Sequence, residues 1–132
     1  MPCILLAEDE QHIARLVQFK LRKEGLEVFI ASNGQEAVAA LELPANERSF
    51  SLIVLDVMMP IMDGWQVLKR LRTSMPERKG IPVLMLTAKS SETDMAKSAE
   101  LGATRFLKKP FDPAELHRVV MEMLAGQPRS GA

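Results

Sequence analysis

Acidic, hydroxyl and basic side chains occur in this chain at the points where four separate apolar segments end. In chain order they are Glu8 and Asp9 after residues 3–7, Asp56 after residues 52–55, Thr87 after residues 81–86, and Lys109 after residues 105–107. Taken one at a time, such residues close a strand, begin a helix or solvate the surface. Complementary groups at four segment ends are much less expected by chance, so their combination predicts a site.

These side chains together are suited to phosphoryl chemistry. Three carboxylates in one crevice repel one another and raise each other's proton affinity unless a cation lies among them. Mg²⁺ prefers oxygen ligands and is typically held by one or two carboxylates plus a substrate phosphate. An aspartate carboxylate is a known phosphoryl acceptor. The transferred group needs a metal, a cation such as Lys109 and a hydroxyl such as Thr87 around its oxygens.

Apolar segments and the stretches between them indicate alternating strands and helices. Strands are expected at residues 3–7, 26–31, 52–55, 81–86 and 105–107. The first helix is predicted by helical spacing, with Ile13, Leu16, Val17 and Leu21 as its buried stripe. Capping residues indicate where the other four helices begin, at Ser32, Asp63, Ser91 and Asp112. The fourth helix has a thin apolar face, which suits a mobile element.

This alternation predicts an α/β fold with a five-stranded parallel sheet. The connections are long enough only for right-handed crossovers. A barrel would need about eight such units, so an open, three-layer, doubly wound sheet with helices on both faces fits better. In that fold the carboxyl ends of the strands face one crevice, where ligands bind. Because Pro60 and Gly64 follow closely, Asp56 is expected at the mouth of a turn and not in the core.

Length and composition limit the function classes. The 132 residues fit one domain, which we expect to span residues 1–125, with residues 126–132 as a flexible tail. Seventeen Lys and Arg residues balance seventeen Asp and Glu residues, so no overall charge favours nucleic acid or an anionic membrane. The single cysteine, Cys3, lies in a predicted buried strand, which fits a reducing compartment. A cytoplasmic location is expected, because neither a membrane span nor a signal peptide is recognisable.

The motifs around the candidate residues resemble the receiver domain of two-component response regulators. They are Glu8-Asp9, Asp56 within Leu-Asp-Val-Met-Met-Pro, Met62-Asp63-Gly64, Leu86-Thr87-Ala88 and Lys109-Pro110-Phe111. The resemblance covers essentially the whole chain. It implies a flavodoxin-like sheet with strand order 2-1-3-4-5, similar to that of the chemotaxis regulator. It also implies a signalling switch that phosphorylation activates.

The resemblance assigns the acidic residues to phosphorylation and to Mg²⁺ binding. Asp56 would be the phosphoacceptor, which takes a phosphoryl group from a phosphohistidine of a sensor kinase. Asp9, Asp56 and the backbone carbonyl of Met58 would bind Mg²⁺, and Glu8 would act through a metal-bound water. The family often has two aspartates where this chain has Glu8 and Asp9, so the longer side chain shifts the expected metal geometry slightly.

The remaining assigned residues bind the phosphoryl group and transmit the signal. Thr87 and Lys109 would hold phosphoryl oxygens, and the peptide bond between Lys109 and Pro110 is expected to be cis. Thr87 and Phe106 would form the switch that acts on the face of the fourth helix, fifth strand and fifth helix. Many relatives have Tyr at the position of Phe106, so this switch is expected to depend on burial of the ring alone.

The resemblance also implies partners. They are a sensor histidine kinase or phosphotransfer protein, and a downstream protein target. We expect no direct contact with nucleic acid or membrane, and a monomer or phosphorylation-dependent dimer. The chain would be no enzyme beyond catalysing its own phosphotransfer and dephosphorylation. Only a short tail follows the last helix, so we expect either a stand-alone regulator or a receiver cut from a longer one.

Three alternative functions fit parts of the pattern. A Mg²⁺-dependent phosphohydrolase or mutase usually has a second acid two residues after its strand-end Asp, where this chain has Met58. A flavodoxin-type electron carrier must bind phosphate in its first loop, which Glu8, Asp9 and Glu10 would repel. The third alternative is a phosphorylation-independent receiver-like interaction module. The intact acidic and phosphoryl-binding residues argue against it.

Overall fold

The structure is a computed structural model that describes residues 2–88 and 92–126. Strands and helices alternate along it as β1 (Cys3–Ala7), α1 (Gln11–Lys23), β2 (Glu27–Ala31), α2 (Gly34–Glu42), β3 (Leu52–Asp56), α3 (Gly64–Ser74), β4 (Val83–Thr87), α4 (Glu92–Glu100), β5 (Arg105–Lys108) and α5 (Pro113–Ala125). Residues 127–132 of the expected tail and the expected helix cap at Ser91 lie outside the described residues. Within the described ranges no helix is long and apolar enough to cross a membrane.

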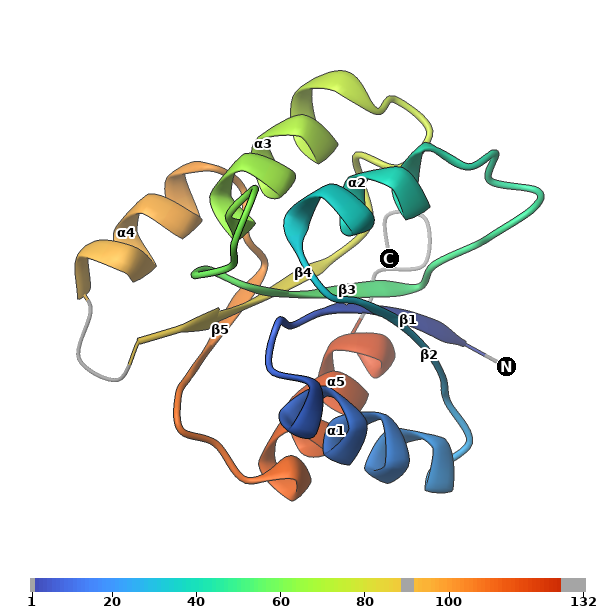
Figure 1. The fold of residues 1–132 in the computed structure, drawn as a ribbon. Coiled ribbons are helices and arrows are strands. Elements are labelled where there is room, and N and C mark those ends of the chain that lie inside the picture. Colours follow the sequence, from blue (N-terminus) through green and yellow to red (C-terminus); the bar gives the residue numbers. More distant parts are fainter. Residues whose placement is uncertain (1, 89–91, 127–132) are drawn as a thin grey trace.

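The five strands form one parallel sheet in the order β2-β1-β3-β4-β5. Helices α1 and α5 cover one face of the sheet, and α2, α3 and α4 cover the other (Figure 1). This arrangement confirms the predicted three-layer, doubly wound fold and its strand order. It also places the carboxyl ends of all five strands at one edge.

The core consists of two apolar layers on opposite faces of the sheet. Successive side chains of a strand point to opposite faces, so Ile53 and Leu55 of β3 pack in the layer under α2 and α3. Leu52 and Val54 of the same strand pack in the layer under α1 and α5. All four side chains are fully buried, and burial of each contributes about 1.5–3 kcal/mol. Because β3 is covered on both faces, its sequence is continuously apolar instead of alternating.

Hydrogen bonds at the helix starts test the predicted caps. Asp63 and Gln66 form the predicted capping box, in which Asp63 Oδ1 accepts from the Gln66 N–H (2.9 Å) and Gln66 Oε1 accepts from the Asp63 N–H (3.0 Å). The prediction of Ser32 as the cap of α2 is wrong by one residue. Asn33 is the cap, and its Oδ1 accepts from the Glu36 N–H at 2.8 Å. Asn caps helices as well as Ser does, so the sequence contained two overlapping signals.

The buried stripe of α1 is narrower than predicted. Ala14, Val17 and Leu21 are buried, whereas Leu16 is 46 % exposed. Consecutive helical residues lie about 100° apart around the axis, so a stripe centred on Val17 leaves Leu16 at its edge. Leu16 therefore faces solvent and does not contribute to the core as expected.

Candidate functional site

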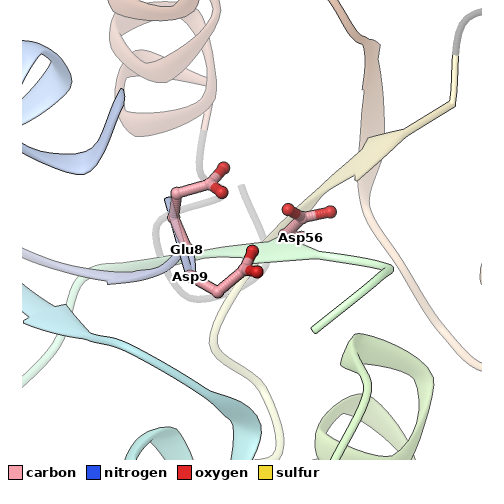
Figure 2. Close-up of side chains that lie close together, drawn as sticks. All are labelled: Glu8, Asp9 and Asp56. Carbon is pink, nitrogen blue, oxygen red and sulfur yellow. The ribbon is translucent and has the colours of Figure 1, made fainter. Parts of the chain in front are cut away.

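The reactive side chains predicted at four strand ends are brought together by the sheet. Glu8 and Asp9 follow β1, and Asp56 ends β3, the neighbouring strand. One carboxylate oxygen from each of the three lies within 4.8 Å of the other two. Figure 2 shows the three carboxylates gathered at the ends of these strands. The parallel topology thus concentrates negative charge at one point.

Asp56 is buried, which differs from the sequence prediction. It ends its strand as expected, but it is only 3 % exposed and does not lie open at the mouth of a turn. Lys109 Nζ lies 2.6 Å from Asp56 Oδ2, and the Met58 N–H donates to Asp56 Oδ1 at 3.1 Å. The lysine reaches across from the loop after β5 and closes over the carboxylate.

Glu8 and Asp9 differ in their exposure. Glu8 is fully buried, and its Oε2 accepts from the Glu10 N–H at 3.1 Å. Its Oε1 lies 3.2 Å from Lys109 Nζ, but it has no hydrogen-bond partner among the described residues. Asp9 is exposed. The site therefore has a buried inner pair of carboxylates and an outer one that meets solvent.

Lys109 only partly balances the two inner carboxylates. Burial, followed by the charge of Asp56, raises the pKa of Glu8 to about 7. Burial also raises the pKa of Asp56, although the hydrogen bond and charge of Lys109 oppose this. Burial lowers the pKa of Lys109, but its hydrogen bond to Asp56 and the two negative charges outweigh that effect and raise it. Two buried acids and one cation leave an excess negative charge, which a second cation would balance.

Thr87 and Lys109 are positioned by the end of the sheet. Thr87 closes β4, next to Lys108 of β5, and its carbonyl accepts from the Lys109 N–H at 2.7 Å. The Thr87 side chain is buried, and Oγ1 has no hydrogen-bond partner in the part of the chain that the structure describes. The peptide bond between Lys109 and Pro110 is cis, as predicted. A buried hydroxyl and an ammonium group therefore lie at adjacent strand ends.

The loop after Asp56 requires a glycine at position 64. The Gly64 N–H donates to the Val57 carbonyl at 2.9 Å. A Cβ on Gly64 would lie 2.3 Å from the Asp56 carbonyl oxygen, closer than atoms can approach. The sequence marked Gly64 only as part of a turn, and it carried no sign of this close approach. The loop is thus anchored directly on the residue that follows Asp56.

Two further residues were predicted to take part in metal binding or signalling. The Met58 backbone contacts Asp56 through the bond described above, while its side chain is 69 % exposed. Phe106 lies opposite Met85 in the pairing of β4 with β5, and its ring is half-buried against the α3 side of the core. The metal-binding role of Met58 and the switch role of Phe106 stay predictions.

One known protein family matches this sequence. The model of the response regulator receiver domain matches residues 4–121. The chain belongs to this family. As a receiver domain, it shares its fold with relatives whose structures have been solved.

Two curated relatives of this receiver domain are transcriptional regulatory proteins. PcoR of Escherichia coli is 43 % identical over 124 residues, which are 94 % of this chain and 52 % of the relative. SrrA of Staphylococcus aureus is 45 % identical over 113 residues, which are 86 % of this chain and 44 % of the relative. The chain spans about half the length of the curated relatives it matches.

Solved structures agree with the fold. The chemotaxis protein CheY4 of Vibrio cholerae superposes with a TM-score of 0.82 at 34 % identity, over 92 % of this chain and 98 % of that one. The receiver domain of the sensor histidine kinase PA1611 from Pseudomonas aeruginosa superposes with a TM-score of 0.79 at 27 % identity, over 95 % and 98 %. That structure is described with a magnesium ion coordinated in the active-site cleft.

Proposed function

We propose that Asp56 is the phosphoacceptor of a two-component switch and receives its phosphoryl group from a phosphohistidine of a sensor kinase or phosphotransfer protein. The observation that carries this proposal is the buried Asp56 carboxylate, held 2.6 Å from Lys109 Nζ beside two further acids. An aspartate that only solvates the surface does not need a cation held against it. An aspartate that accepts a highly charged phosphoryl group needs such a cation, because the cation balances the charge of that group.

Phosphoryl transfer to Asp56 exchanges one bond to phosphorus for another. An Asp56 oxygen forms the new P–O bond while the P–N bond to the donor imidazole breaks. The electron pair of that bond stays on the imidazole nitrogen, and Asp56 becomes an aspartyl phosphate. Lys109 moves from the carboxylate toward the phosphoryl oxygens, and the Thr87 hydroxyl, which has no partner in the described structure, donates to one of them.

The acidic cluster fits a bound Mg²⁺. Its donors are all oxygens, the set this ion prefers, and the buried Glu8 Oε1 lacks a hydrogen-bond partner among the described residues. We assign Asp9, Asp56 and the Met58 carbonyl as direct ligands, with Glu8 acting through a bound water. When bound there, Mg²⁺ would supply positive charge that offsets the carboxylates and the incoming phosphoryl group.

The signal would leave the site through the face formed by α4, β5 and α5. Recruitment of Thr87 toward the phosphoryl group would free space that the Phe106 ring can enter, which shifts the population of this face. Arg105 of β5 and Arg118 of α5 both pair with Glu122, at 2.8 and 2.9 Å. This charged surface suits a downstream protein target.

The same proposal includes the partners of the protein and the limits of its domain. Residues 1–125 form the receiver unit, and a cytoplasmic kinase or phosphotransfer protein is its donor. The output is a protein contact or phosphorylation-dependent dimer and not direct contact with nucleic acid or membrane. The only chemistry catalysed is the protein's own phosphotransfer and dephosphorylation.

The deciding experiment is the intact-protein mass after incubation with acetyl phosphate and Mg²⁺. We expect a gain of one phosphoryl group, and no gain for Asp56→Asn or for wild type in EDTA. Thr93→Ala, an exposed substitution away from the site, is the matched control and should label like wild type. If wild type gains no mass although Mg²⁺ binding is measured independently, the phosphorylation-independent interaction module becomes the better description.

A further inference from the structure

The attachment of α4 to the rest of the protein depends on a polar residue. A helix that covers a sheet normally buries an apolar stripe. Within the described helix α4, Ser98 alone is buried, and it is fully buried. The sequence prediction of a thin apolar face is therefore confirmed. Burial of apolar side chains therefore contributes little to the attachment of α4.

Ser98 is bound by the side chain of Trp65 from the neighbouring helix. Trp65 Nε1–H donates to Ser98 Oγ at 2.9 Å. Lys97 Nζ lies 4.2 Å from the centroid of the same ring, which is a cation–π contact. Figure 1 shows α3 and α4 side by side on this face of the sheet. Two adjacent residues of α4, Lys97 and Ser98, therefore both contact the Trp65 side chain.

The backbone of Trp65 is tied to the loop that follows Asp56. Trp65 is the second residue of α3, directly after Gly64. The Gly64 N–H is bonded to the Val57 carbonyl, and its Cα leaves no room for a side chain against the Asp56 carbonyl. A displacement of the Asp56 loop therefore has to move the start of α3 and the indole with it.

We infer that Trp65 is a positioning residue that holds α4 through Ser98 and carries displacement of the Asp56 loop to that helix. The first part stands on the contacts above. The second part rests on the proposed function, because phosphorylation supplies the displacement. The Trp65 ring belongs to neither the acidic cluster nor the phosphoryl-binding pair.

Amide hydrogen exchange on the metal-free protein tests the attachment. Ser98→Ala removes the acceptor, whereas Thr93→Ala removes an exposed hydroxyl from the same helix and serves as the matched control. Both changes raise helix propensity, so propensity predicts slower exchange in each. We expect α4 amides to exchange roughly three- to tenfold faster in Ser98→Ala alone, the factor that one hydrogen bond contributes. Equal exchange in the two variants would overturn the inference.

Trp65→Phe keeps an aromatic ring but removes the indole donor, together with part of the ring volume. It should accelerate exchange in α4 at least as much as Ser98→Ala does, and the double variant should exchange no faster than Trp65→Phe, because both changes break the same hydrogen bond. Additive effects would show that the two residues act separately and would contradict the inference. As the chain has one tryptophan, the emission maximum gives a second signature: it should shift in Ser98→Ala and not in Thr93→Ala.

Transmission is tested by adding Mg²⁺ and beryllofluoride, a phosphoryl mimic. In wild type, exchange should change both in residues 57–63 and in α4. In Trp65→Phe the change in residues 57–63 should remain and the change in α4 should fall to less than half. A full α4 response in Trp65→Phe, or none in wild type, would overturn transmission. Failure of the proposed function shows separately, as absence of labelling by acetyl phosphate, and leaves the exchange comparison of the metal-free variants decisive for the attachment.

Discussion

The metal-free protein is predicted to lose stability as the pH rises from about 4.5 to about 7, because of Glu8. Its side chain is fully buried. Burial and the charge of Asp56 raise its pKa from 4.5 to about 7 in the folded state, and Lys109 offsets this only in part. In this pH range the folded protein keeps the proton on Glu8, whereas the unfolded chain has released it.

The sign and size of the effect follow from this proton balance. Since the folded state binds more protons than the unfolded state, the free energy of unfolding falls as the pH rises. A pKa difference of one corresponds to about 1.4 kcal/mol, so a change from 4.5 to about 7 predicts a loss on the order of 3 kcal/mol. Asp56, whose pKa is also raised by burial, adds a loss of the same sign at the acid end. A loss of this size is a large part of the stability of a typical domain.

Glu8→Gln isolates this contribution, because glutamine has the shape of the protonated acid. Urea denaturation in EDTA, followed by circular dichroism from pH 4.5 to 8, should give a flatter profile for the variant. The variant should match wild type at pH 4.5 and exceed it by about 3 kcal/mol at pH 8. Glu47→Gln, an exposed change, is the control and should follow wild type throughout. Mg²⁺ should restore wild-type stability at pH 8, because it stabilises the ionised carboxylates.

Parallel pH profiles for wild type and Glu8→Gln would refute the reasoning. So would a variant that is less stable than wild type at pH 8. The second result would mean that the pairing of ionised Glu8 with Lys109, at 3.2 Å, outweighs the desolvation of the carboxylate.

Three further substitutions test the backbone and a buried cation. Gly64→Ala is predicted to lower the free energy of unfolding by about 3 kcal/mol or more, because its Cβ would meet the Asp56 carbonyl oxygen; a wild-type melting temperature would contradict this. Arg78→Met should lower it by about 2–4 kcal/mol in urea denaturation, since the buried guanidinium donates to two carbonyls of the loop after α2; a loss below about 0.5 kcal/mol would show that water replaces it. Ile61→Gly should raise stability by about 1 kcal/mol, because this β-branched residue has φ of 71° and is 72 % exposed; lower thermal stability would disprove the strain.

The fold was predictable because several independent signals agree. The apolar run before Asp56 indicated a strand covered on both faces, and the structure buries residues of β3 in both layers of the core. The alternation of strands and helices fixed the parallel topology, and that topology alone brings Glu8 and Asp56 to one edge. The position of each site residue along its strand was therefore available from the sequence.

The burial of the site was not predictable in the same way. Proline and glycine after Asp56 correctly indicated a turn, and a turn usually meets solvent. Whether the carboxylate is open depends on how far Lys109 reaches from a loop more than fifty residues away. The sequence identifies the lysine and its charge, but its 2.6 Å approach to Asp56 is a property of the packed structure. The raised pKa of Glu8 depends on the same packing.

The contact between Trp65 and Ser98 shows why polar residues in helices are difficult to interpret from sequence. Counting apolar residues correctly found α4 to have a thin apolar face, and a helix with little apolar burial is expected to open easily. A serine is not counted among the apolar residues, although Ser98 is the residue of the described helix that is buried. Its hydroxyl gives α4 a directional bond where an apolar stripe would give only area. A directional bond is lost over a small displacement, whereas apolar contacts slide and persist. An attachment of this kind therefore suits a helix that must be held in one state and released in another.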